Sequence, residues 1–121
     1  MSGNYIAPGS TVEWLNETGN DYLSGAVVIV GDIATVCEVD IADDETGTVC
    51  IEGVFEVACK SSDTINIGER LAWDVSAGKM TTNLGTPATG DCENCAVAMS
   101  YSGPGNLLVN AKLTPGTGST T

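Results

Sequence analysis

The sequence predicts an all-β fold: a small single-domain β-sandwich or barrel, jelly-roll-like, of about eight short strands with an extended N-terminal arm. Several segments alternate apolar and polar residues with a period of two, as half-buried strands do. The composition, with 15 Gly and 4 Pro among 121 residues, is typical of short strands joined by tight turns. No segment carries an extended apolar stripe at helical spacing.

Residues 1–15 are interpreted as an extended arm that leads into a first strand. The beginning of this segment is polar and contains Pro8-Gly9, a turn signal. Its last five residues alternate weakly, with Val12 and Trp14 on one face. The main β domain is expected to span residues 16–114.

A tight hairpin is predicted next. Residues 26–30 form a short apolar run that is typical of a buried strand, and residues 33–39 follow it. The two residues between them, Gly31-Asp32, have the length and composition of a hairpin turn. Residues 40–46 then form an acidic turn.

Residues 47–60 carry the clearest strand pattern in the chain. Their odd positions are nearly all apolar, and the charged side chains fall on even positions: Glu52, Glu56 and Lys60. This segment holds the only Phe, Phe55, which we expect at the centre of the core. Gly53 lies in mid-strand and predicts a bulge, a bend or a close backbone approach.

Four further strands are predicted in the second half of the chain, over residues 70–75, 79–82, 94–101 and 107–113. The first two form a hairpin around Ser76-Ala77-Gly78, with Leu71, Trp73 and Val75 on one face. Residues 115–121 are small and polar, and they are expected to form a flexible C-terminal tail.

The charge balance excludes several functions. The formal net charge is −12 and the chain contains no His. Nucleic acids and anionic membranes would be repelled, so neither is expected as a partner. Without His the chain lacks the usual general base near neutral pH, and we expect neither catalysis nor a cofactor. The N-terminal residues have no signal-peptide pattern, so synthesis in the cytosol is expected.

The pair Cys92 and Cys95 is the feature most like a motif. A redox role requires a thiol with a lowered pKa, which the flanking Asp91 and Glu93 disfavour. A structural zinc site needs four ligands, usually in two close pairs, whereas the other cysteines are dispersed. The plainer interpretation is that the pair consists of loop thiols or forms an incidental disulfide.

The remaining candidates for a metal or a core role have simpler explanations. Cys37 and Cys59 are expected to be small core residues. The acids of residues 40–46 do not have the spacing of an EF-hand loop and are interpreted as a solvated turn. No metal site is therefore predicted.

The order and spacing of several short motifs resemble a known family. These motifs occupy residues 8–9, 23–31, 40–42, 45–49, 53–57, 60–63, 67–74 and 78–82. From residue 5 to about residue 100, the chain resembles the small capsid cement, or head decoration, proteins of tailed bacteriophages. Residues 94–98 (Asn-Cys-Ala-Val-Ala) depart from the Ile-Gly-Val-Ala that the family usually has there.

The resemblance implies a structural protein without enzymatic activity. Such a protein would be made in the host bacterial cytoplasm and would bind the outer capsid surface of the virion. There it would bridge subunits of the major capsid protein and stabilise the shell against internal DNA pressure. The resemblance also implies a homo-oligomer, for which we favour a trimer over a dimer.

This interpretation suggests which residues contact the capsid and which contact a second copy. Residues of the arm are expected to bind the capsid: Tyr5, Ile6, Pro8 and Trp14. Contacts within the oligomer are expected from Trp73, Arg70 and Met80. The alternative function is a β-sandwich adhesin that binds host surfaces from the virion. It is less favoured because the sequence has no aromatic cluster for a sugar platform, and a thiol-redox protein is the third possibility.

Overall fold

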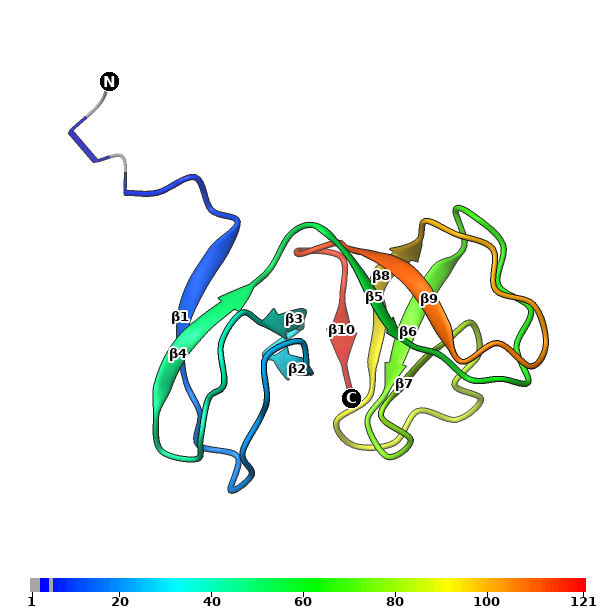
Figure 1. Ribbon diagram of the computed structural model, residues 1–121, viewed down its shortest axis with the longest axis horizontal. Helices are drawn as coiled ribbons and strands as arrows, with labels where there is room; N and C mark the ends of the chain where they lie inside the picture. Colours follow the sequence, from blue (N-terminus) through cyan, green and yellow to red (C-terminus); the bar gives the residue numbers. More distant parts are fainter. Residues whose placement is uncertain (1–2, 5) are drawn as a thin grey trace.

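The computed structural model describes residues 3–4 and 6–121, and over these residues the chain forms ten strands and no helix. The predicted all-β class is confirmed. The ladders of both sheets are antiparallel, and one sheet has four strands while the other has six (Figure 1).

The four-stranded sheet is formed by the first four strands of the chain. Its order is β1 (Thr11–Leu15), β4 (Thr46–Cys50), β3 (Ile33–Cys37) and β2 (Val27–Val30). Ala34 and Val36 pack against the larger sheet. A second, smaller core is formed by Val28, Cys37, Ile41 and Val49.

The six-stranded sheet curls into a barrel-like body. Its order is β5 (Val54–Ala58), β9 (Leu108–Leu113), β8 (Cys92–Ala98), β6 (Arg70–Asp74) and β7 (Lys79–Thr81), with β10 (Ser119–Thr120) paired to β8. Cys59, directly after β5, forms a parallel bridge with Met80 of β7, so the two ends of the sheet meet. The main core fills this body, with Ile65, Leu71 and Val109 almost fully buried.

The segment 47–60 is two strands and not one. β4 belongs to the four-stranded sheet and β5 to the barrel, and the chain passes between them at Gly53, where φ is +119°. Glycine adopts such a φ without steric penalty, which allows the chain to change sheets there. Phe55 is half-buried at the border of the main core, so its expected place at the centre was wrong.

The predicted hairpins are present with small differences. Val30 pairs with Ile33 across Gly31-Asp32, and the positive φ of Gly31 is that of a II′ turn. The loop between β6 and β7 has four residues, because Asp74 pairs with Lys79. Val75 lies in this loop and is exposed, whereas Leu71 and Trp73, which were predicted to share its face, are buried.

The C-terminal segment forms part of the fold, where a flexible tail was expected. β10 pairs with β8 through Ser119–Glu93 and Thr120–Cys92 and lies between the two sheets (Figure 1). Backbone hydrogen bonds join Thr121 to Gly90 and Asp91. The eight predicted strands thus become ten, because the predicted strand over residues 47–60 is divided at Gly53 and β10 is added.

Candidate functional site

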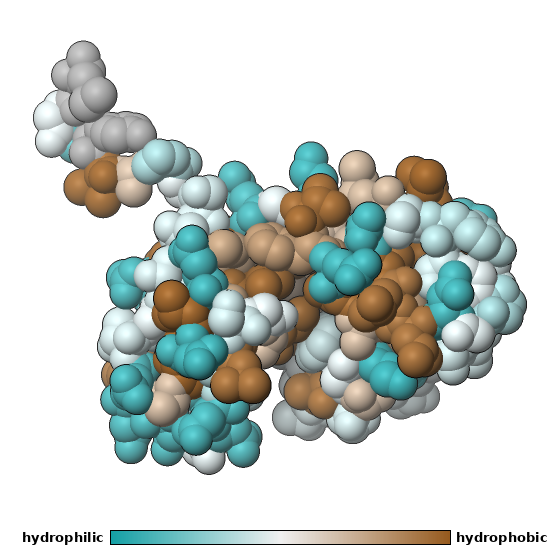
Figure 2. Space-filling view, viewed as in Figure 1, coloured by the Kyte–Doolittle hydropathy of each residue, from teal (hydrophilic) through white to brown (hydrophobic). Residues whose placement is uncertain are grey.

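Residues 6–10 of the N-terminal arm stand away from the body of the protein (Figure 2). Residues 6–10 are all exposed, and Ile6 exposes 91% of its surface. Pro8 is exposed as well, and Gly9 turns the chain with φ of +88°. Tyr5, the other predicted arm contact, lies outside the described residues. The arm therefore presents an apolar side chain that its own chain leaves uncovered.

Trp14 differs from the other predicted arm contacts because it is half-buried. Its ring packs against Tyr22 with a centroid distance of 6.2 Å and an interplanar angle of 54°. Both rings border the smaller core. Trp14 therefore anchors β1 to the body, and a role in capsid contact stays a prediction.

β1 forms an open edge of the four-stranded sheet, since β4 is its only strand partner among the described residues. The C=O of Ser10 accepts from the N–H of Ile51 at 2.9 Å. The N–H of Asn16 donates to the C=O of Glu45 at 2.9 Å. Because hydrogen-bonded pairs alternate along an antiparallel ladder, three residues direct their backbone N–H and C=O outward: Thr11, Glu13 and Leu15.

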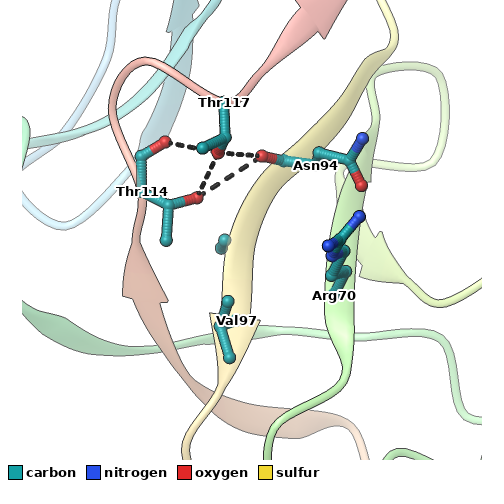
Figure 3. Close-up of a pocket in the computed structure, with 6 residues that line it drawn as sticks. Arg70, Asn94, Val97, Thr114 and Thr117 are labelled. Atoms are coloured by element: carbon teal, nitrogen blue, oxygen red, sulfur yellow. Dashed lines mark hydrogen bonds between the residues drawn. The ribbon is translucent and has the colours of Figure 1, made fainter.

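A second surface feature is a groove of about 210 Å³ on the barrel, which we call the Arg70 groove. Figure 3 shows its side chains: Arg70 from β6, Asn94 and Val97 from β8, and Thr114 and Thr117 from the segment after β9. Arg70 and Asn94 also line an adjoining hollow of about 270 Å³. The groove thus combines a guanidinium, an amide and two hydroxyls around a small apolar floor.

A β-bulge shapes this groove. The β6–β8 register shifts between Leu71 and Trp73, and Asn94 in the shifted stretch of β8 has φ of +54°. The hydroxyl of Thr117 donates to the C=O of Asn94 at 2.8 Å, and that of Thr114 donates to it at 3.4 Å. Bulges reorient side chains, and this one is fixed by two hydroxyls.

Sequence reasoning placed Arg70 on the surface but missed its neighbours in the groove. A signal for the bulge was present, because Cys92 and Cys95 lie three residues apart in a strand and yet both are buried. Period-two alternation would put them on opposite faces. An apolar pair at that spacing predicts an extra residue, and Asn tolerates the left-handed conformation best among larger residues.

Two of the three predicted oligomer contacts are core residues. Met80 is fully buried and Trp73 exposes 8% of its surface, so these side chains are covered by their own chain. The two residues pair directly across the β6–β7 hairpin, and this face points into the barrel. Arg70 alone of the three is exposed.

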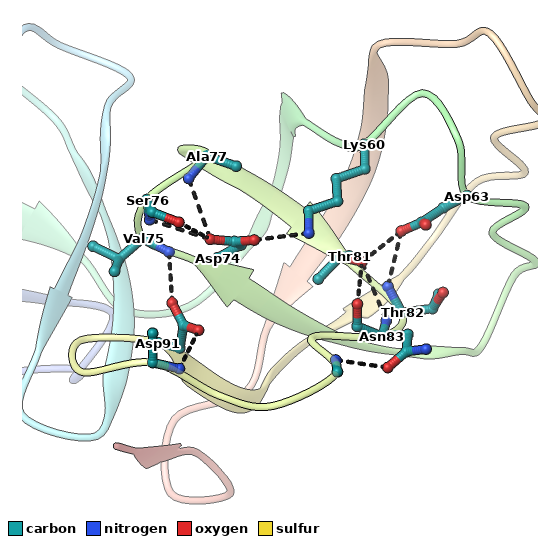
Figure 4. Close-up of polar contacts among 12 residues, drawn as sticks. Lys60, Asp63, Asp74, Val75, Ser76, Ala77, Thr81, Thr82, Asn83 and Asp91 are labelled. Atoms are coloured by element: carbon teal, nitrogen blue, oxygen red, sulfur yellow. Dashed lines mark hydrogen bonds and ion pairs between the residues drawn. The ribbon is translucent and has the colours of Figure 1, made fainter.

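The acids near the β6–β7 hairpin serve as acceptors for the fold (Figure 4). Lys60 Nζ lies 2.7 Å from Asp74 Oδ2. Asp63 Oδ2 accepts from the Thr81 hydroxyl at 2.6 Å, and Asp91 accepts from the N–H groups of Val75 and Ala88. These carboxylates are engaged with backbone and side-chain donors of their own chain, and their role is therefore to stabilise the fold.

All five cysteines are free thiols. Cys92 and Cys95 are buried in β8, whereas loop thiols or an incidental disulfide were expected. Burial, with a smaller contribution from Cys92, raises the pKa of Cys95 to about 12. Cys95 therefore lacks the thiolate character that thiol-redox chemistry requires. Cys37 and Cys59 are buried, as predicted.

The described part of the chain contains neither a candidate metal cluster nor a candidate membrane-spanning helix. There, no group of three or more His, Cys, Asp or Glu residues is placed to hold a metal ion. The same residues include no helix of the length and apolarity needed to cross a membrane.

Comparison with known proteins gives one match. A family model described as "Phage cement protein" matches residues 6–113. No curated protein and no solved structure matches the chain. The matched region includes the arm from Ile6, β1 and the lining of the groove up to Val97.

Proposed function

Because the chain belongs to the phage cement protein family, a structural component of the phage capsid, we propose that it decorates the outer surface of the head. There it binds the major capsid protein, bridges neighbouring subunits and stabilises the shell against internal DNA pressure. Its action is structural and requires no catalysis. Synthesis takes place in the host bacterial cytoplasm.

The observation that carries this proposal is the exposed arm continuing into an open strand edge. Ile6 exposes 91% of its surface on a segment that leads directly into β1. Thr11, Glu13 and Leu15 offer unpaired backbone groups along that edge. The edge has neither Lys nor Pro in β1, the residues that usually protect such edges from pairing.

Strand addition explains how these features would bind a capsid. A capsid segment that pairs with β1 gains main-chain hydrogen bonds, while Ile6 and Pro8 dock in apolar hollows beside it. Each contact is modest, but a protein that engages several subunits at once gains avidity from the linked contacts. Bridging requires that the arm and the β1 edge contact different subunits of the capsid.

Self-association belongs to the proposal, with a trimer favoured over a dimer. Trp73 and Met80 are not candidates for contacts between copies, because both are buried in the core of their own chain. Arg70 is the exposed candidate that is left, and its groove is the surface to consider.

The arm is tested with two matched substitutions in the full chain. Ile6→Asp places a charge on the arm, and Ile67→Asp places the same charge on another apolar residue, which exposes 69% of its surface. We expect Ile6→Asp to reduce occupancy on purified undecorated heads by about tenfold, since burial of one large apolar side chain contributes 1.5–3 kcal/mol.

The same titrations separate an arm effect from a folding effect. Ile67→Asp should bind heads like the wild type, and both variants should unfold at the wild-type temperature because neither residue is buried. Unchanged occupancy of Ile6→Asp would show that the arm does not make the contact. No head binding by the wild type would refute the decoration role itself.

A further inference from the structure

Charge is distributed unevenly along this chain. Residues 1–50 contain nine of the 16 acidic residues and none of the four basic ones. The remainder holds seven acidic and all four basic residues: Lys60, Arg70, Lys79 and Lys112. The four-stranded sheet and its loops are therefore strongly negative, and every cation belongs to the second half of the chain.

Arg70 is a cation without an acidic partner. The ion pair of Lys60 with Asp74 is the one salt bridge within residues 3–4 and 6–121. Arg70 is exposed and lines both the groove and its adjoining hollow, and Glu93, which also lines the hollow, forms no ion pair with it. A guanidinium beside an amide is suited to a carboxylate, which accepts two hydrogen bonds from Arg at once.

The turn before β4 carries carboxylates that could fill this groove, and we call Asp44 and Glu45 the acidic tip. Both are exposed, and no hydrogen bond or ion pair of their carboxylates is found within the described residues. Their backbone is fixed: the N–H of Asp44 donates to Asn16 O at 2.7 Å, and Glu45 O accepts from the N–H of Asn16. Asn16 is fully buried.

We propose that the Arg70 groove of one copy receives the acidic tip of a second copy. The tip and the groove lie on different sheets of one chain and form no ion pair with each other. Complementary charge between two copies supplies the partner that the groove lacks within one. The inference rests on the proposed function only in that copies of a decoration protein sit side by side on a shell.

The two surfaces share one feature of backbone conformation. Asp44 and Asn94 are the two non-glycine residues with positive φ over the part of the chain that the structure describes. Asp and Asn adopt this conformation more readily than other non-glycine residues, and each holds a local turn or bulge here. One lies in the acidic tip and the other in the groove.

The contact is heterologous, because two different surfaces meet. A heterologous contact closes into a ring when its rotation allows and otherwise extends into a filament. The net charge of −12 opposes association at long range, but charges more than about 8 Å apart are largely screened at physiological ionic strength. The local pairing of Arg70 with a carboxylate therefore determines whether two copies associate.

Charge reversal tests the inference in the full-length protein. Arg70→Glu and the double substitution Asp44→Lys/Glu45→Lys each place like charges in the contact, so each should lower the association constant by about tenfold or more. All three substitutions in one chain reverse both sides and should restore the constant to about its original value. Sedimentation velocity at physiological ionic strength measures it.

Lys112→Glu is the matched control. It makes the same charge change on an exposed residue of β9, two strands from β6 and roughly 10 Å from Arg70. Its association constant should stay close to that of the wild type. Melting temperatures of Arg70→Glu and Lys112→Glu should agree with that of the wild type, since neither side chain is buried. Variants with Asp44→Lys should melt somewhat lower, because φ at residue 44 is +66° and aspartate adopts this conformation more readily than lysine.

Three outcomes would overturn the inference. The first is an association constant of Arg70→Glu equal to that of the wild type. The second is a triple variant that is folded but does not regain the wild-type association constant. The third is a wild-type chain that is monomeric at about 100 µM and binds heads without cooperativity. If Arg70→Glu loses head binding with unchanged self-association, the groove receives the capsid, and the proposed function stands without this contact.

Discussion

Thr120 and Asp32 lie 88 positions apart in the chain, yet the backbone N–H of Thr120 donates to Asp32 Oδ1 at 2.8 Å. The hydroxyl of Thr120 also donates to the C=O of Gly31 at 2.7 Å. At the same time, Thr121 exchanges backbone hydrogen bonds with Gly90 and Asp91 beside β8. The last residues of the chain thus join the turn between β2 and β3 to the barrel.

Removal of residues 119–121 should therefore destabilise the protein. The truncation removes the β10–β8 pairing and both contacts of Thr120 with the β2–β3 turn. Since an intramolecular hydrogen bond contributes about 1 kcal/mol, we expect a loss of roughly 2–3 kcal/mol. Chemical denaturation measures this loss. Thr121→Ala, which keeps the backbone bonds, is the control, and an unchanged midpoint after truncation would mean that the tail is not held in solution.

The Lys60–Asp74 pair gives a prediction on pH. The hydrogen bond from Lys60, followed by those from the Ser76 hydroxyl and the Ala77 N–H, lowers the pKa of Asp74 from 3.8 to about 2. A carboxyl whose pKa is lower in the folded state stabilises the fold above its unfolded pKa, and this contribution disappears as the pH falls through the folded pKa.

Asp74→Asn should therefore be less stable than the wild type at pH 6, and the difference should shrink between about pH 4 and pH 2. Urea unfolding at several pH values provides the measurement. Glu52→Gln removes an exposed acid that forms no ion pair within the described residues, and it should show no comparable trend. A difference for Asp74→Asn that is constant down to pH 2 would contradict the assigned pKa.

Alternation identified most strands because residues facing the core must be apolar, but it could not show which strands share a sheet. The apolar positions Val49 and Val57 keep the same parity on both sides of Gly53 and are buried in two different cores. Only the glycine indicated the change of sheet. Alternation also cannot distinguish a face inside a barrel from one that meets a second subunit, and Trp73 and Met80 were misassigned for that reason.

The C-terminal strand and the groove could not be predicted from the sequence, for another reason. β10 is held by backbone groups and by the small side chain of Thr120, which leave no hydrophobic pattern. The groove depends on contacts between β8 and the segment that follows β9, about 20 positions away in the chain. The exposure of residues 6–10 agrees with the polar start and the Pro8-Gly9 turn signal, whereas their contact with a capsid stays a prediction.

The buried thiols should resist alkylation in the folded protein. Cys95 has a pKa of about 12 because of burial, so very little thiolate exists at pH 7.5. Cys50 is half-buried, and burial together with the nearby Glu38 raises its pKa too. Iodoacetamide should thus label Cys50 first and slowly, whereas all five cysteines should react in guanidinium. Peptide mapping by mass spectrometry reports the order, and rapid native labelling of Cys92 or Cys95 would revive a redox role.

Asn16 should be one of the least replaceable polar residues. Its Nδ2 donates to the C=O of Asn20 at 2.7 Å and of Ile41 at 3.2 Å, and its Oδ1 accepts from Thr18. Asn16→Asp keeps the shape but replaces a donor by a second acceptor facing two carbonyls. We expect a loss of about 2–4 kcal/mol, because buried groups are left unsatisfied and a charge is buried.

Thermal and chemical unfolding measure the effect of Asn16→Asp. Asn20→Ala is the control, since Asn20 contributes its backbone carbonyl, which alanine retains. A stability of Asn16→Asp within about 0.5 kcal/mol of the wild type would show that Asn16 is not essential to the loop that carries Asp44.

The open edge of β1 is tested by proline at a single position. The N–H of Thr11 points away from β4, so Thr11→Pro removes a donor from the outer edge and keeps the ladder within the chain. Proline is tolerated on edge strands where the N–H faces solvent, and the fold should survive. Thr11→Ala removes the same side chain but retains the N–H. If capsid binding adds a strand to β1, Thr11→Pro should lower head occupancy severalfold, since a hydrogen bond contributes about 1 kcal/mol, while Thr11→Ala should bind normally. Equal binding by the two variants, both folded by circular dichroism, would exclude strand addition at β1 and leave the apolar arm as the contact.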